Sequence, residues 1–170
     1  MSSNEHINKQ MLKTTLSIPS KDICGNLDNI IKQKLNELLE GYCYNEGYVI
    51  KDSINIIQRN IGMIKTQNNK STVNYLINYT ADIICPSEGD IYDVHINNIN
   101  KMGIISYFKI KDSDTHESSP LIIMIPKEYM EESILNIEDL HIGQKLKVVV
   151  IGSRIKFRSD KIQIIAKPYS

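Results

Sequence analysis

The sequence predicts an α+β domain, built as strand, helix and three antiparallel strands, followed by an all-β barrel of five strands. Three observations lead to this fold class. Residues 26–40 have the apolar spacing of an amphipathic helix that can cover one face of a sheet. Short alternating stretches rich in β-branched residues surround this helix. A Pro-Ser-Glu-Gly segment at residues 86–89 then separates two groups of strand-like runs.

The predicted helix is the clearest element of the first domain. Asn26 is a suitable N-cap, and Gly41 stands where a left-handed residue often ends a helix. The apolar residues recur every three or four positions and form one face: Leu27, Ile31, Leu35 and Leu38.

The strands of the first domain follow from alternation and turn residues. We expect one strand at residues 12–18, which ends at Pro19, and another at residues 42–51, interrupted by Gly47. A third covers residues 53–65, with Gly62 at a bulge, and a fourth covers residues 72–85. The polar residues 67–70 between these last two strands predict a hairpin.

The second half has short β segments at close spacing. We expect strands at residues 90–99, 103–110, 121–125, 145–151 and 161–166, with a polar loop at residues 111–119. A short helix is expected near residues 128–133, between the third and fourth strands. This order of elements is that of an OB-type barrel.

The composition gives no sign of catalysis. The four histidines are isolated from one another in the sequence. Neither of the two glycine-rich phosphate-binding motifs, GxxxxGK[ST] and GxGxxG, is present. The three cysteines, Cys24, Cys43 and Cys85, contain no closely spaced pair, so we expect reduced thiols, no zinc and no other cofactor. No apolar run is long enough to span a bilayer and no signal peptide is visible, so we expect a soluble intracellular protein.

Positive charge is concentrated near the end of a chain that has 20 basic and 20 acidic residues in all. Residues 141–170 contain seven basic residues and the single acid Asp160. In an OB barrel the loop between strands four and five borders the ligand groove, where stacking and phosphate attraction hold single strands. The sequence therefore predicts RNA contact by Arg154, Lys156, Phe157, Arg158 and Lys161, together with Tyr107, Phe108 and Lys109 on strand two. The alternative is a basic hairpin that serves solubility alone.

Several stretches, in order, resemble one known family. They are residues 16–19 (LSIP), 35–48 (LNELLEGYCYNEGY), 57–64 (IQRNIGMI), 79–89 (YTADIICPSEG) and 90–103. Over residues 11–168 this pattern is similar to the larger stalk subunit of DNA-directed RNA polymerases, a family that includes the seventh subunit of RNA polymerase II and its archaeal counterpart. The Asn- and Ile-rich composition is typical of an AT-rich genome and favours a large DNA virus as the source.

The resemblance implies a domain plan and a role. Residues 11–86 would be a tip domain that inserts into the polymerase core, and residues 87–170 an OB-fold domain of the ribosomal S-one type. Residues 1–10 precede the stretch that shows the resemblance, and we expect them to be a disordered tail. The family's partners are the core subunits, a small stalk subunit and nascent single-stranded RNA. We expect the core contact near Gly47, Tyr48, Gly62 and Met63. Ile104 follows Gly103 at a position where such domains often have Phe. We therefore expect RNA contact to depend on electrostatic attraction more than on base stacking.

The resemblance implies a non-catalytic subunit that acts in transcription initiation and in guiding nascent RNA. Its location would be the nucleus of a cell, or a virion or host cytoplasm for a virus. Two alternatives stay open. One is a free-standing OB protein that binds single-stranded RNA, and the other is a scaffold subunit whose basic hairpin contacts protein.

Overall fold

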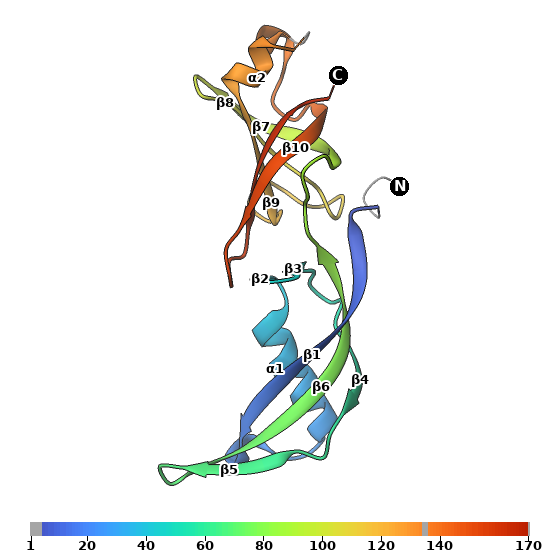
Figure 1. Ribbon diagram of the computed structural model, residues 1–170, viewed down its shortest axis with the longest axis vertical. Coiled ribbons are helices and arrows are strands. Elements are labelled where there is room, and N and C mark those ends of the chain that lie inside the picture. The colour runs from blue at the N-terminus through green and yellow to red at the C-terminus, as the bar shows by residue number, and fades with distance from the viewer. Residues whose placement is uncertain (1–4, 134–135, 170) are drawn as a thin grey trace. The chain divides into compact units, whose positions relative to one another are not determined.

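The computed structural model describes residues 5–133 and 136–169, which form two compact units (Figure 1). We call the first the sheet unit, made of residues Asn8–Gly41 and Val49–Ile83. The second is the barrel unit, made of Ile84 onward, the segment Tyr42–Tyr48 and the described part of the N-terminal segment that ends at Ile7. The sequence predicts a single domain boundary at residues 86–89. In the structure, each unit is instead made of more than one segment of the chain.

The barrel unit contains a closed barrel of five strands: β7 (Ile91–Asn100), β8 (Gly103–Tyr107), β9 (Leu121–Pro126), β10 (Lys145–Ile155) and β11 (Ile162–Pro168). The strands follow the order β10-β11-β9-β8-β7, and β10 also pairs with β7. All pairs are antiparallel except β11 with β9. The prediction of a five-stranded barrel is confirmed, and its strand order is consistent with the OB type.

Alternation along the barrel strands builds its interior. Every second residue points inward, and the buried set is dominated by branched aliphatic side chains that favour strands. A polar side chain lies among them, and its hydroxyl is satisfied, because Ser106 Oγ donates to the carbonyl oxygen of Ile123 at 3.0 Å. The fully buried strand residues include Tyr92, Val94, Ile96, Ile104, Leu121, Ile123, Ile125, Val148, Val150, Ile162, Ile164 and Ala166.

The barrel strands are linked by two short helical segments and a polar loop. Helix α2 (Lys127–Glu131) follows β9 and buries Met130, and the 3-10 turn η3 (Ile137–Asp139) precedes β10. The segment at residues 86–89 is a turn before β7, in which Ser87 N donates to Asp90 Oδ2 at 2.9 Å.

The segment Tyr42–Tyr48 corrects the expectation of one long strand at residues 42–51. It forms most of a small antiparallel hairpin, β2 (Cys43–Tyr44) and β3 (Gly47–Val49), with Cys43 opposite Tyr48. The cause is local, because Gly47 has a φ of 131° and the two residues before it form a turn that reverses the chain.

The sheet unit is built around the long strand β6 (Lys70–Ile84). Strands β1 (Ile7–Pro19), β4 (Asn55–Arg59) and β5 (Met63–Gln67) each pair with it. β1 begins at Ile7, so the last four residues of the predicted disordered tail, residues 7–10, are strand; residues 1–4 lie outside the described residues. The 3-10 turn η2 (Ser20–Asp22) follows β1.

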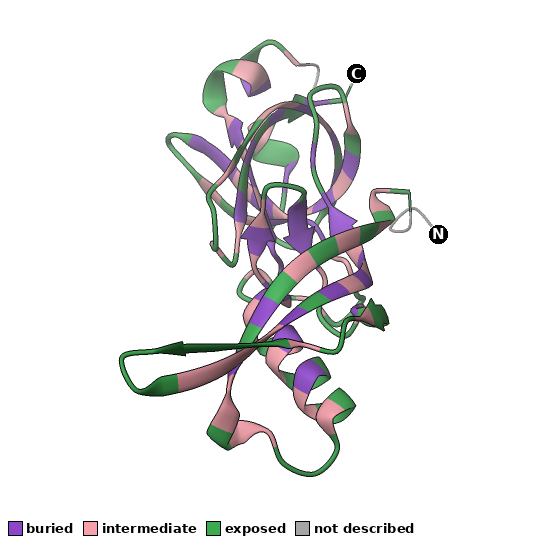
Figure 2. Ribbon diagram, turned by 60° about the horizontal axis from the view of Figure 1, so that its bottom comes forward, coloured by how far each residue is buried: buried purple, intermediate pink, exposed green. Residues whose placement is uncertain are grey.

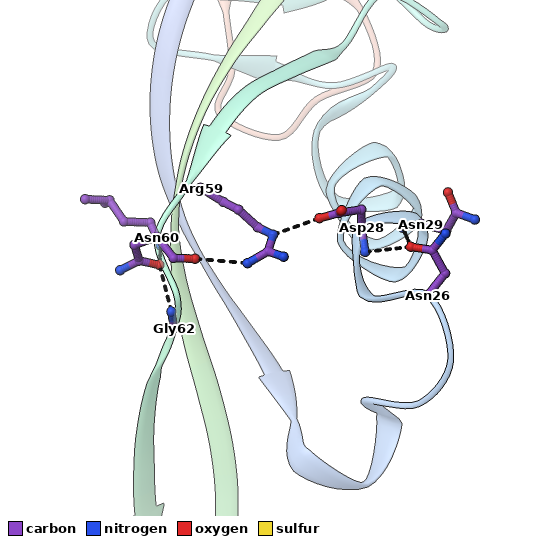
Figure 3. Close-up of polar contacts among 7 residues, drawn as sticks. Asn26, Asp28, Asn29, Arg59, Asn60 and Gly62 are labelled. Atoms are coloured by element: carbon purple, nitrogen blue, oxygen red, sulfur yellow. Dashed lines mark hydrogen bonds and ion pairs between the residues drawn. The ribbon is translucent and has the colours of Figure 1, made fainter.

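The predicted strand at residues 53–65 is wrong as one element, because it is broken between β4 and β5 (Figure 3). Asn60 accounts for the break: its Oδ1 accepts from Gly62 N at 3.2 Å and from Leu76 N at 3.0 Å. Gly62 has a φ of 92°, and a Cβ there would lie 2.7 Å from the Tyr75 ring. The glycine predicted as a bulge thus permits a left-handed bend beneath an aromatic ring.

Helix α1 (Leu27–Leu39) confirms the prediction made from its capping residues and apolar face. Asn26 Oδ1 accepts from Asp28 N at 3.1 Å and from Asn29 N at 3.4 Å, which satisfies two of the free N–H groups at the helix start (Figure 3). Gly41 has a φ of 80°, as expected beyond a helix end. The buried helix residues are Ile31, Leu35 and Leu39.

The turn between β5 and β6 is a two-residue hairpin. Asn68 and Asn69 both have positive φ, 52° and 61°, which is the conformation of a type I′ turn. Asparagine tolerates this region better than other residues with a Cβ. The predicted polar turn is confirmed. Within the described residues, no helix is long and apolar enough to cross a membrane.

Gly103 lies where β8 pairs with β9, at a position that leaves no room for a Cβ. Its φ is +138°, and a Cβ at this position would overlap the carbonyl oxygen of Ile125 and lie 2.9 Å from Lys127 N. We expect Gly103→Ala to lower the free energy of unfolding by about 3 kcal/mol, since neither backbone group can move away without breaking the β8–β9 pairing. Urea unfolding measures the change.

Gly152→Ala is the matched control, because Gly152 has open space around its Cα and no positive φ. It should change the free energy of unfolding by no more than about 0.5 kcal/mol. Equal effects of the two substitutions would contradict the steric argument.

Candidate nucleic-acid interface

Barrel pairing brings together residues that lie far apart in the sequence. Tyr107 on β8 is opposite Ile122 on β9, Ile122 is opposite Gln163 on β11, and Gln163 is opposite Arg154 on β10. The neighbours of Ile122 along its strand, Leu121 and Ile123, are fully buried, so this row lies on the outside of the barrel. We call the four residues Tyr107, Ile122, Gln163 and Arg154 the barrel row.

The loop between β10 and β11 extends the barrel row with a further cation. Arg154 and Lys156 are exposed. They line a hollow of about 200 Å³ with Ser159, Lys161 and Gln163. Neither Arg154 nor Lys156 is among the ion pairs of the described residues. Both side chains can therefore meet an anion without first breaking a salt bridge.

The tip of the same loop contacts the hairpin residues of the barrel unit. Arg158 N donates to the Cys43 carbonyl oxygen at 2.7 Å, and Cys43 N donates to the Ser159 carbonyl oxygen at 2.8 Å. The Phe157 ring meets the Tyr44 ring edge-on at 5.3 Å between centroids. The Arg158 guanidinium lies 5.6 Å from the centre of the Tyr42 ring. Two residues predicted to bind RNA thus contact the protein itself, although Phe157 remains 64% exposed.

Lys161 has a different role from its neighbours in the predicted set. Its ammonium group donates to the carbonyl oxygens of Glu117 at 2.7 Å, Ser119 at 2.8 Å and His116 at 3.4 Å. An ammonium group has three N–H donors, so these contacts use all of them. Lys161 holds the end of the β8–β9 loop against the barrel and has no donor left for a phosphate.

The adjacent aromatic residues Tyr107 and Phe108, at the end of β8, point to opposite sides of the barrel wall, as strand alternation requires. Phe108 is 3% exposed and lies edge-on to Tyr92 at 5.0 Å, so it belongs to the core and cannot stack on a base. Tyr107 is half-buried at the surface, 5.8 Å from the His95 ring and 6.1 Å from the His116 ring.

The sequence did not point to the two histidines beside Tyr107. His95 Nδ1 and His116 Nε2 are buried and have no hydrogen-bond partner within the described residues. Burial lowers the pKa of His95, and the nearby charges of Lys109 and Lys145 lower it further, whereas Asp93 opposes them. The imidazole is therefore neutral near pH 7 and adds ring surface to Tyr107. Only the register, which sets His95 opposite Tyr107, reveals this grouping.

The four residues predicted to contact a polymerase core belong to two different units. Gly47 and Tyr48 are buried in the barrel unit, where burial chiefly raises the pKa of Tyr48 to about 12. Gly62 and Met63 lie at the break in the sheet unit, and Met63 is 65% exposed. Further exposed apolar side chains lie on both faces of this part of the unit, since Ile64 is opposite Val73 and Leu76 alternates with it along β6. They are Ile57, Ile61, Ile64 and Leu76.

Groups able to hold a metal do not converge in the part of the chain that the structure describes. It contains no cluster of three or more His, Cys, Asp or Glu residues suited to a metal ion. Burial, with a smaller contribution from Asp160, raises the pKa of the Cys43 thiol to about 11, so this cysteine stays protonated at neutral pH.

A scan against models of known protein families finds none that matches this chain. The assignment of a role therefore depends on the architecture, on the residues of the surface and on the order of the sequence segments.

The role of Lys161 can be tested separately. Lys161→Met keeps the aliphatic stem but removes three hydrogen bonds, so we expect the amides of residues 116–119 to exchange hydrogen about tenfold faster or more. Lys167→Met is the control, because Lys167 is an exposed cation of the same strand region and is not one of the donors to the carbonyl groups of this loop. The same exchange rates in both variants would show that the ammonium does not hold this loop.

Proposed function

We propose that this chain is a non-catalytic stalk subunit of a DNA-dependent RNA polymerase, which acts in transcription initiation and in guiding nascent RNA. The observation that supports the proposal most is the closed barrel of OB-type strand order, with the barrel row and the cations Arg154 and Lys156 on its outer surface. The order of sequence segments that resembles the larger stalk subunit supports it independently.

The barrel surface favours weak, salt-sensitive RNA contact. Tyr107 is its half-exposed stacking group, and Arg154 and Lys156 are its available cations. On a single strand each neutralised phosphate changes the slope of log affinity against log salt by about −0.7. Two such contacts give a slope of about −1.4, which suits a transcript that must keep sliding past the protein.

The exposed apolar residues of the sheet unit suit attachment to large polymerase subunits. Ile61 is 95% exposed, Ile64 74% and Met63 65%, all within one short stretch of chain. Burying such side chains against a partner contributes about 25 cal/mol for each Å² removed from water. Met63 and Ile64 are consecutive on β5 and point to opposite faces, so in this proposal the core contact includes both faces of this strand. A small stalk partner is a further subunit of the assembly.

A second candidate function is a scaffold subunit whose basic loop contacts only protein. The contacts of Phe157 with Tyr44 and of Arg158 with Tyr42 favour this candidate, because these two residues of the β10–β11 loop already contact the protein itself. A free-standing RNA-binding OB protein is the third candidate function. It would be identified by RNA binding of a chain that co-purifies with no polymerase subunit.

RNA contact at the barrel can be tested with Arg154→Glu combined with Lys156→Glu. We expect the affinity of the full chain for single-stranded oligo(U) to fall about tenfold at low salt, with the salt slope reduced by about 1.4. Fluorescence anisotropy over a range of salt concentrations gives both values. Arg158 is left unchanged, because its substitution would also disturb the contact with Tyr42.

The matched control is Lys101→Glu with Lys167→Glu, which changes charge equally at exposed lysines that do not line the hollow and are in none of the ion pairs of the described residues. If the control pair weakens binding as much as the hollow pair, the contact is a general charge effect. If neither pair changes the affinity, the scaffold candidate is favoured.

Polymerase assembly can be tested by co-purification of the tagged chain from its natural source. We expect the large polymerase subunits and a small partner to be recovered with it, and Ile61→Asp with Ile64→Asp to reduce that recovery at least about fivefold. Both side chains are exposed, so the substitutions should leave the fold intact.

Met102→Asp with Ile142→Asp is the control, since these apolar residues of the barrel unit are 70% and 71% exposed. Recovery of the wild-type chain without large polymerase subunits would overturn the proposed function. Equal loss with both pairs would place the core contact elsewhere.

A further inference from the structure

A second basic surface lies in the sheet unit, at the hairpin of β5 and β6. A hollow of about 500 Å³ opens there, and residues from three strands and their turn line it. Figure 2 shows this hairpin with few buried residues along its length. The lining residues are Ser17, Lys65, Gln67, Asn68, Lys70, Thr72 and Asn74.

The register places the hollow on the sheet face opposite to the core. Lys65 is paired with Thr72 and Gln67 with Lys70, so these side chains share one face. Further along β6, Tyr75, Ile77 and Tyr79 are buried, and they alternate with Thr72 and Asn74. The hollow therefore belongs to the face that the core does not use.

The charge around this hollow is one-sided. Residues 53–81 contain three basic residues, Arg59, Lys65 and Lys70, and no Asp or Glu. Arg59 is paired with Asp28 at 2.8 Å (Figure 3), whereas Lys65 and Lys70 take part in none of the ion pairs found within the described residues. On a chain with no net charge, this is a local concentration of two uncompensated cations.

The remaining lining groups are hydrogen-bonding side chains. Ser17 Oγ donates to Asn74 Oδ1 at 2.6 Å, which uses one lone pair of that oxygen and leaves the NH₂ group of the amide as a donor. Gln67, Asn68 and Thr72 add further amide and hydroxyl donors. Two ammonium groups surrounded by neutral donors form a set that suits phosphate oxygens.

The hollow lacks the apolar centre that a protein partner would need. Protein interfaces usually bury an apolar core within a polar rim, and none of the described residues that line this hollow is aliphatic or aromatic. Without an aromatic residue in that lining, base stacking is no source of affinity. What remains is recognition of a phosphate backbone, which carries no sequence information.

We propose that the β5–β6 hairpin is a second nucleic-acid contact, which binds the phosphodiester backbone of a strand without reading its bases. It goes beyond the proposed function, because it lies in the sheet unit and uses none of the residues of the barrel row. RNA and DNA strands are bound alike, since the donors meet phosphates and no base or sugar edge.

The test uses the full chain with Arg154→Glu and Lys156→Glu already present, so that the barrel cations do not contribute. Adding Lys65→Glu and Lys70→Glu should weaken binding of labelled oligo(dT) and oligo(U) about tenfold at low salt and equally for both strands. The salt slope should fall by about 1.4. Unchanged thermal unfolding confirms that the variant is folded.

Lys32→Glu with Lys51→Glu is the control, because both lysines are exposed in the sheet unit and lie outside the hollow. An equal loss of affinity in the control, or no loss in the hairpin variant, overturns the proposal. So does competition by poly-glutamate as strong as that by unlabelled oligo(dT), which would identify an acidic protein as the ligand. The test does not depend on whether Arg154→Glu and Lys156→Glu weaken RNA binding. The effect of Lys65→Glu and Lys70→Glu is measured relative to the chain that already has both barrel substitutions.

Discussion

The pairing of β9 with β11 is the constraint on which the barrel and its surface depend. It is the parallel contact in an otherwise antiparallel set, and it joins the third strand of the barrel to the fifth. Without it the sheet would have two free edges and the barrel row would be divided, with Tyr107 on one part and Arg154 on the other. Closure thus creates the apolar interior and places the residues of the barrel row on the outside of one continuous sheet.

Much of the fold could be predicted from the sequence, because the relevant signals are local. Asn26, Gly41 and the apolar spacing between them specify the helix, and both capping positions are observed. The two asparagines of the β5–β6 turn and the alternating runs of the barrel are equally local. The break at Asn60 could not be predicted in this way, because it depends on a hydrogen bond to Leu76, which lies on another strand.

The candidate site was less predictable, because exposure and partners are tertiary properties. Alternation indicates that one of Tyr107 and Phe108 is buried, but only packing against Tyr92 shows which. Lys161 has the same charge as Lys156, yet one is engaged by three carbonyl groups and the other is exposed. A count of charges along the chain could not separate these two roles.

The basic surface at the β5–β6 hairpin could not be predicted from the sequence for the same reason, because it depends on tertiary structure. The basic excess near the end of the sequence is conspicuous, since seven cations fall within residues 141–170. Lys65 and Lys70 stand five residues apart among neutral neighbours and form no run. Their significance follows from the turn, which brings both lysines and the donors of β1 to one hollow. Overall neutrality of a chain therefore does not exclude separate surfaces for a polyanion.

The membership of Tyr42–Tyr48 in the barrel unit has a consequence for how this chain can change over evolutionary time. The barrel unit draws on three separate stretches of sequence, and the sheet unit on two stretches between them. A recombination event at residues 86–89 would transfer the five barrel strands but leave behind Cys43, whose backbone groups pair with the loop at Arg158 and Ser159. Neither unit is a contiguous cassette, so we expect the two to be inherited together and to accept insertions in loops more readily than exchange of either half.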